Sequence, residues 1–282
     1  MKLQMDKTQI VLTIILGLLA IFMLLPIVFI FMQAFKPLSE LFLYPPRFYV
    51  MNPTLQNFTQ LLVSVDVAVV PVVRYIFNSI LTSSITVVVV VIVSTMVAYA
   101  LSKHNFIGKN TILDVTIMAL MFAPQAVLIP RYIITQRLGI IDTYLAHILP
   151  FVAAPVSVFL FKQFVDQVPD DLLASARIDG ASEWHILFNI ILPICRPAVS
   201  TIALLTFQAT WNTLEPSIYY IENEAMRTLP FFLGTLTSGL ANNVAGQGAA
   251  AAAGLLLFLP NLIFFLIMQS RVIQTMAYSG LK

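Results

Sequence analysis

Charged residues are scarce in this chain of 282 residues. Only 10% of its residues are Asp, Glu, Lys or Arg, whereas 59% are hydrophobic, and its mean hydropathy is +0.92. A soluble domain carries about 25% charged residues, so this chain has too few charges to cover a water-exposed surface of its length. We therefore predict an integral membrane protein.

Other absences exclude several classes of site. The single cysteine, Cys195, allows no internal disulfide and no cysteine metal cluster. His104, His147 and His185 show no ligand spacing, so we expect no metal site. The net charge of +2 comes without a basic cluster, so no nucleic-acid partner is expected. Nothing matches the phosphate-binding pattern G-x-x-x-x-G-K-[ST], so this chain should not bind ATP by that device.

Long apolar runs are what the chain has instead. A spanning helix needs roughly 20 apolar residues, and an isolated strand would leave its backbone unpaired in lipid, so even the valine-rich run before Ser94 is predicted to be helical. The first run is too long for a signal-peptide core, and we expect an uncleaved helix. The prediction is a single all-α membrane domain over residues 1–282, with spans at 9–34, 75–102, 112–131, 143–162, 197–220 and 249–270.

The loops between the spans indicate how the chain is oriented in the membrane. Six spans place both termini on one side, and a cytoplasmic N-terminus leaves nine Lys and Arg inside against six outside, which favours that orientation. Residues 36–73 then form an outer loop. The stretch Gly234–Ala253 is rich in Gly, Ala and Asn, which predicts a flexible connector that leads into a closely packed small-residue helix.

The polar segment 163–195 interrupts the apolar pattern on the cytoplasmic side. Asp170 and Asp171 follow Pro169 and favour a helix start there. Gly180 suits the left-handed residue that ends a helix, and Ser182 suits the N-cap of a second helix that closes at Leu192-Pro193. We predict two short helices parallel to the membrane with Trp184 and His185 exposed. Their apolar positions are Leu172, Leu173 and Ala176, then Trp184, Leu187, Phe188 and Ile191.

Two interpretations of this segment remain open on physical grounds. An amphipathic connector could rest its apolar stripe on lipid headgroups. However, the stretch from Lys162 to Arg196 holds five acids and three bases, and an acidic surface is not drawn to anionic lipid. The alternative is a docking surface for another protein.

The same segment resembles the "EAA" loop of ABC importer permeases. The resemblance rests on Ala174 to Ser182, which read A-S-A-R-I-D-G-A-S, and on Leu192-Pro193 at the family's spacing from Gly180. Further likenesses extend along nearly the whole chain and point to the maltose-type, carbohydrate-uptake branch and to its six-helix partner. They are Tyr44-Pro45-Pro46, Pro53 to Phe58, Tyr75 to Ile80, Leu138 to Tyr144, Trp211-Asn212, Arg227 to Pro230 and Met276 to Lys282.

The resemblance implies a function and a set of partners. The chain would be a non-enzymatic permease subunit in a bacterial or archaeal cytoplasmic membrane, beside a homologous second permease. Two cytoplasmic ATPase subunits would bind ATP and Mg, an extracytoplasmic solute-binding protein would deliver sugar, and the two permeases would work by alternating access. The residues expected to couple to the ATPase are Ala174, Ala176, Arg177, Asp179, Gly180, Ala181, Ser182, Glu183, Trp184 and His185.

Three positions depart from the family pattern. The motif's Glu is replaced by Ala174 and its first Ala by Ser175, so an expected charge is missing from the loop. Whether another acid replaces that charge is left open by the sequence. The acid often found after W-N is Thr213 here, which puts in doubt any substrate role borrowed from that position.

Polar residues within spans are candidates for a solute path because burying them in lipid is costly. Asn and Gln can bond sugar hydroxyls, and Trp offers a flat apolar face to a sugar ring. Equally, such residues can hold helices together, Asn78 can act as a cap, and Gln125 can mend a break at Pro124. The candidates are Gln208, Trp211, Asn212 and Glu215, expected on one helical face, together with Asn78 and Gln125.

Two rival functions remain. A permease for peptides or amino acids would share the loop motif, although the outer-loop and tail likenesses favour sugar. A self-contained secondary transporter or channel would carry ionisable residues at mid-membrane and inverted repeats. No repeat is evident in the sequence, and Glu215 is the nearest such ionisable residue.

Overall fold

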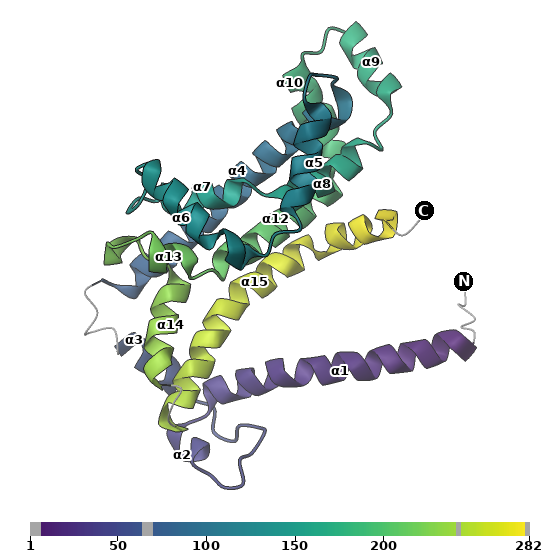
Figure 1. Cartoon of the computed structure of the whole chain (residues 1–282). Coiled ribbons are helices and arrows are strands. Elements are labelled where there is room, and N and C mark those ends of the chain that lie inside the picture. Colours follow the sequence, from purple (N-terminus) through teal and green to yellow (C-terminus); the bar gives the residue numbers. More distant parts are fainter. Residues whose placement is uncertain (1–6, 64–69, 241–243, 280–282) are drawn as a thin grey trace. The chain divides into compact units, whose positions relative to one another are not determined.

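The computed structural model describes residues 7–63, 70–240 and 244–279, and every regular element within these ranges is helical (Figure 1). The chain divides into two compact units. The first unit comprises the described residues within 1–68 and 233–259, and the second comprises those within 69–232 and 260–282.

The first unit begins with α1 (Lys7–Phe35), which is apolar on all sides. The stretch Thr8–Phe35 is about 42 Å long at 1.5 Å per residue, more than the roughly 30 Å of a bilayer core, and none of its most apolar window is buried within the chain. A helix that is apolar all round needs lipid or other apolar helices around it. This agrees with the expected first span.

Side-chain hydrogen bonds fold the loop after α1. It contains α2 (Leu38–Leu41) and α3 (Gln56–Val63). Glu40 accepts the backbone N–H groups of Met51 at 3.0 Å and Asn52 at 2.8 Å. The buried amide of Asn57 donates to the carbonyls of Ala34 at 2.9 Å and Lys36 at 2.8 Å, which fixes α3 against the end of α1.

The stretch 234–253 is mainly helical, so the predicted flexible connector is wrong. α14 covers Leu229–Leu240 and α15 covers Val244–Ser279, while residues 241–243 lie outside the described ranges. Small side chains explain the difference, because Ala249 and Ala252 are fully buried and let the helix pack closely. The predicted close packing of this alanine run is confirmed.

The second unit is built around α4 (Val72–Lys103), which packs against α7 (Leu145–Val152), α8 (Pro155–Val165) and α12 (Arg196–Trp211). The valine run is helical, as predicted. The buried face of α4 is lined by Ser and Thr, whose small size allows close approach. The hydroxyls of Thr82, Thr86 and Thr95 donate to carbonyls one turn earlier at 2.6–2.7 Å, which satisfies them inside an apolar core.

Three of the expected spans are not single straight helices. In place of 112–131 the chain forms α5 (Lys109–Ala119), η1 (Pro124–Val127) and α6 (Leu128–Arg137), with a bend of 113°. In place of 143–162, α7 and α8 meet at 48°. In place of 197–220, α12 ends at Trp211 and a separate helix, α13 (Glu215–Tyr219), follows.

Proline accounts for these breaks. Pro124, Pro155 and Pro216 each stand at the first or second position of a helix, where the missing N–H costs nothing. Before Pro124 and Pro155 the proline also pushes the preceding residue, Ala123 or Ala154, out of the helical conformation. Three helices of the described chain are long and apolar enough to cross a membrane alone, and six crossings result if each bent pair is one span.

Candidate functional site

The segment 163–195 lies at one end of the second unit, where Figure 1 places α9 and α10 beyond α8. Its first helix, α9 (Asp170–Ile178), begins after Pro169 with two acidic residues, as predicted. Asp170 accepts a hydrogen bond from the Lys103 ammonium at 2.8 Å, and this bond lowers the pKa of the Asp170 carboxyl. Lys103 also donates to the Val168 carbonyl at 2.6 Å, so the last residue of α4 holds the start of α9.

The turn after α9 is a Schellman motif. The Ala181 N–H donates to the Ala176 carbonyl at 2.9 Å and the Gly180 N–H to the Arg177 carbonyl at 3.0 Å, while Gly180 takes a φ of +82°. The prediction that Gly180 adopts the left-handed conformation is confirmed. A Cβ at Gly180 would meet no atom within 4 Å, so the backbone alone demands glycine here.

A second helical stretch follows the turn. The side chain of Ser182 accepts the His185 N–H at 3.3 Å, which confirms the predicted N-cap of α10 (Glu183–His185). The helix continues through a π-helical turn, η2 (Ile186–Ile191), into α11 (Leu192–Ile194). The stretch ends at Ile194, one residue after the predicted closure at Leu192-Pro193, and the chain bends beside Cys195.

Glu183 is the centre of a polar cluster. Its carboxylate accepts hydrogen bonds from Arg177 Nε at 2.9 Å and from the Tyr99 hydroxyl at 2.5 Å, and it lies 3.4 Å from His104 Nε2. The Arg177 guanidinium, with a smaller effect from Tyr99, lowers the pKa of the Glu183 carboxyl. This cluster links α9, α10 and the end of α4.

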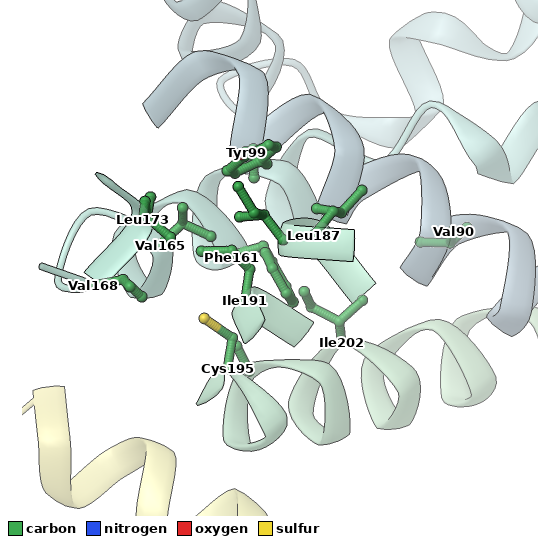
Figure 2. Packing of buried hydrophobic residues seen from close by; sticks show 13 residues of the cluster. Val90, Tyr99, Phe161, Val165, Val168, Leu173, Leu187, Ile191, Cys195 and Ile202 are labelled. Atoms are coloured by element: carbon green, nitrogen blue, oxygen red, sulfur yellow. The ribbon is translucent and has the colours of Figure 1, made fainter. Parts of the chain in front are cut away.

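Only part of the predicted apolar stripe is buried in protein, because Leu172, Trp184 and Phe188 are exposed. Leu173, Ile186, Leu187 and Ile191 belong to one core with side chains of α4, α8 and α12. Figure 2 shows Leu173, Leu187 and Ile191 gathered with Tyr99, Phe161, Val165 and Ile202. Because these side chains pack on the chain's own helices, they are unavailable for lipid headgroups, which argues against a simple amphipathic connector.

Other side chains of the segment point outward. Ile178 is 86% exposed and Trp184 is 59% exposed, and Trp184 stacks on Phe188 with ring centroids 6.0 Å apart. Beside them an open hollow of about 560 Å³ is lined by Ala176, Asp179, Gly180, Ala181, Ser182, His185 and Ile190. Exposed large apolar side chains are typical of a surface that receives a partner.

The position of the missing motif Glu is exposed, and so are all five acids of the segment. Ala174 is exposed on α9. Glu183 is already bonded to Arg177 and Tyr99 within the chain. Asp171 and Asp179 are exposed, and neither carboxylate makes an ion pair within the part of the chain that the structure describes.

The four candidates near Trp211 do not share one helical face. Because α12 ends at Trp211, Glu215 belongs to a different helix, and the predicted common face is wrong. Trp211 is buried and stacks on Phe207 at 5.5 Å, whereas Gln208 and Asn212 are exposed. Asn212 accepts a hydrogen bond from Asn261 at 3.1 Å and donates to the Gln208 carbonyl at 2.8 Å.

Glu215 is bound by its own chain. Arg131 Nη1 lies 2.9 Å from Glu215 Oε1, and the Tyr220 hydroxyl donates to the same oxygen at 2.7 Å. Both members of the ion pair are mostly buried, at 26% and 19% side-chain exposure. This ion pair joins α6 to α13, so its role is structural.

Asn78 and Gln125 lie in contrasting surroundings. Asn78 is fully buried and donates to the carbonyls of Ala225 and Arg227 at 2.8 Å each, while the Tyr144 hydroxyl donates to it at 2.8 Å. It therefore holds the segment after α13 against the start of α4. Gln125 lies in η1 with its side chain exposed.

Sequence reasoning missed Tyr99, Lys103, Ile178 and Arg131. Tyr99 and Arg131 contact partners 84 residues away and Lys103 contacts one 67 residues away, so no local pattern could have paired them. Ile178 carried a usable signal. It lies five residues after Leu173 and two after Ala176, out of phase with the buried side of α9.

These features define a class of protein. Apolar helices that can cross a membrane up to six times, with a rigid polar segment at one end, make the chain a multi-pass membrane permease subunit. More particularly, it belongs to the family of binding-protein-dependent transport system inner membrane components, whose profile matches residues 90–272.

Relatives and a solved structure agree with this family. The chain is 29% identical to the arabinooligosaccharides transport system permease protein AraQ of Bacillus subtilis, over 99% of this chain and 98% of the relative. It is 28% identical to the sulfoquinovosyl glycerol permease protein SmoH of Agrobacterium fabrum, over 92% and 89% of the two chains. A chain from the crystal structure of a bacterial ABC transporter involved in the import of alginate matches its fold, with a TM-score of 0.75, 20% identity, and 94% and 98% coverage.

Proposed function

We propose that this chain is the permease subunit of an ATP-driven, binding-protein-dependent importer for an oligosaccharide or another carbohydrate. Family membership supports the transport role. The names of similar relatives support the solute class, since they are permease proteins for arabinooligosaccharides, sulfoquinovosyl glycerol and, in Mycobacterium tuberculosis, trehalose. The chain itself would carry out no chemistry.

The proposed topology has six crossings. α1, α4 and α15 would each cross once, and the bent pairs at 109–137 and 145–165 would make one further crossing each. The third bent pair joins Glu183–Ile194 to Arg196–Tyr219 at 83°, and only its second arm, Arg196–Tyr219, would cross. Both termini would then lie in the cytoplasm, with residues 163–195 on the same side. The weak excess of Lys and Arg on that side supports this orientation.

The segment 163–195 is proposed to be the coupling loop that docks in a cleft of a cytoplasmic ATPase. One observation carries this proposal: the loop buries one apolar side in its own chain and leaves Ile178 and Trp184 exposed. Aromatic anchors dominate many protein interfaces. Two ATPase subunits, which would bind ATP and Mg, a homologous second permease and a solute-binding protein would complete the transporter.

The proposed solute path uses amides that the chain leaves exposed. Gln208, Asn212 and Gln125 are exposed and could bond sugar hydroxyls. Trp211, Glu215 and Asn78 are packed or bonded within the second unit, so we assign them to supporting that path rather than to contacting the solute.

Co-purification tests the docking role of the loop. The chain and its ATPase subunit are coexpressed, the chain is captured by a tag, and the ATPase retained is measured. Ile178→Ser and Trp184→Ala should reduce retention, whereas Ile107→Ser, which changes an equally exposed isoleucine in the turn after α4, should not. Full retention by both loop variants would contradict the proposal.

A further inference from the structure

Two side chains at the end of α4 hold the two helices of the coupling loop separately. Tyr99 and Lys103 are four residues apart, so they lie on one face of α4. Tyr99 binds Glu183 at the start of α10, and Lys103 binds Asp170 at the start of α9. The loop is therefore fixed at both of its helices from a single turn of one membrane helix.

The loop needs such support because its helices are short. α9 has nine residues, and isolated helices shorter than about 12–15 residues are marginal in water. The second helical stretch, Glu183–Ile194, is at the lower end of that range. Leu173 is the only fully buried residue that α9 contributes to the core. Ala176 packs against the same core partly buried, and Arg177 bonds Glu183, so both contacts lie in the later part of α9. Lys103 adds a fixed point at its first residue, Asp170.

The burial of Lys103 strengthens its attachment to the start of α9. Its side chain is 7% exposed, against 85% for Asp170, and its ammonium bonds both that carboxylate and the Val168 carbonyl. A buried ammonium left without these bonds would carry a large desolvation cost. Tyr99 is likewise buried, and its ring meets the His104 ring edge-on at 5.1 Å.

We propose that Tyr99 and Lys103 are positioning residues that make the coupling loop move as one body with α4. The inference rests on the proposed coupling function. A docked ATPase would displace α9 and α10, and the two anchors would pass that displacement to α4 and thus to α7, α8 and α12, which pack on it. Without the anchors the loop would shift while the membrane helices stayed in place.

The test uses the complete transporter in proteoliposomes, with Lys103→Met and Tyr99→Phe separately and together. The exposed docking side chains remain, so each variant should keep its ATPase and its basal ATP hydrolysis. Uptake of labelled arabinotriose per ATP hydrolysed should fall about tenfold in the double variant, as expected for losing hydrogen bonds to charged groups.

A second readout does not depend on the solute. Spin labels at Ser175→Cys on α9 and Ile107→Cys after α4, both exposed sites, report the separation of the loop and the helix. The labelled chain that keeps Tyr99 and Lys103 should give one narrow distance distribution. The labelled double variant should give a broad one. Lys103→Arg, which keeps the charge and the donors, should restore the narrow distribution.

Lys162→Met is the matched control. Lys162 pairs with Asp166 at 2.7 Å, a Lys–Asp contact of the same kind that lies at the end of α8 and reaches neither α9 nor α10. It should change neither readout. Unchanged coupling and a narrow distribution in the double variant would overturn the inference, as would loss of the ATPase from it. Failure of the unaltered chain to retain an ATPase would instead refute the proposed function.

Discussion

Gly180 shows how one residue shapes the coupling loop. Its φ of +82° reverses the chain after α9, so that Ala181 can close the turn on Ala176 and Ser182 can cap α10. Both the glycine and the cap were predictable, because each depends on the chemistry of a few neighbouring residues. The anchors at Tyr99 and Lys103 were not predictable, because their partners are distant in sequence.

Gly180→Ala should loosen this turn. A left-handed conformation costs a residue with a Cβ roughly 1–2 kcal/mol, and no steric clash adds to that cost. We expect the Ala181 amide to lose about tenfold of its hydrogen-exchange protection. Gly180→Asn should lose less, since Asn tolerates this conformation better. Equal protection in the Ala variant and the unaltered chain would contradict the strain argument.

The pH response of the loop follows from Glu183, which lies outside the proposed spans. A carboxyl whose pKa is lowered on folding stabilises the folded form above its ordinary pKa, and this contribution is lost as pH falls through the lowered value. The ordinary value for Glu is 4.5, and Arg177 lowers it here. The spin-label distance between positions 175 and 107 should therefore stay narrow down to pH 4.5 and broaden only below it.

Arg177→Met provides the comparison. Without the guanidinium, the main cause of the lowered pKa is gone, so broadening should begin at a higher pH than in the unaltered chain. Identical pH midpoints in the two proteins would show that Glu183 does not control the loop.

Asn78 should matter for structure rather than for solute contact. Asn78→Ala leaves the Ala225 and Arg227 carbonyls and the Tyr144 hydroxyl without this partner, at about 1–3 kcal/mol for each buried polar group. We expect faster hydrogen exchange in residues 224–228 and a lower thermal midpoint. A change in solute preference at unchanged stability would contradict this assignment.

At the scale of elements, local patterns identified the helices but not their bends. α1, α4 and most of α15 follow from long apolar runs, and the helical form of the valine run follows from the lack of backbone partners in lipid. The breaks at Pro124 and Pro155 were visible as residues, yet whether a proline kinks, breaks or starts a helix depends on packing around it. The prediction of a flexible connector at 234–253 was wrong because it also depended on packing. Buried alanines stabilise a helix there, although the Gly and Asn residues of the stretch do not favour one.

Two glycines of α15 form a matched pair of tests. A Cβ at Gly248 would lie 2.5 Å from Asn57 Oδ1, whereas one at Gly254 would meet nothing within 4 Å. Asn57 cannot easily move, because it bonds two carbonyls near the end of α1. Gly248→Ala should therefore destabilise by about 1–3 kcal/mol through overpacking. Gly254→Ala should be neutral or stabilising, because Ala favours helix by about 1 kcal/mol.

Thermal unfolding in detergent compares the two variants. We expect a lower midpoint for Gly248→Ala than for the unaltered chain, and an equal or higher midpoint for Gly254→Ala. The reverse order would mean that α15 does not approach Asn57 as closely as the structure places it.

At the scale of the whole molecule, composition and family membership describe a membrane subunit that depends on other chains. The uniformly apolar α1 and the exposed side chains of the coupling loop are surfaces that the chain does not cover itself. The sequence could predict the class and the loop. It could not separate the amides proposed to contact the solute from the other candidates, because burial distinguishes Gln208 and Asn212 from Trp211.

ATP-driven uptake is the most direct test of the central claim. The complete transporter is reconstituted in proteoliposomes with ATP inside and the solute-binding protein outside, and uptake of labelled arabinotriose, trehalose and an amino-acid mixture is measured. The account predicts carbohydrate uptake that requires ATP, the binding protein and both permeases. Uptake by this chain alone, without ATP or partner subunits, or uptake of amino acids but of neither carbohydrate, would contradict it.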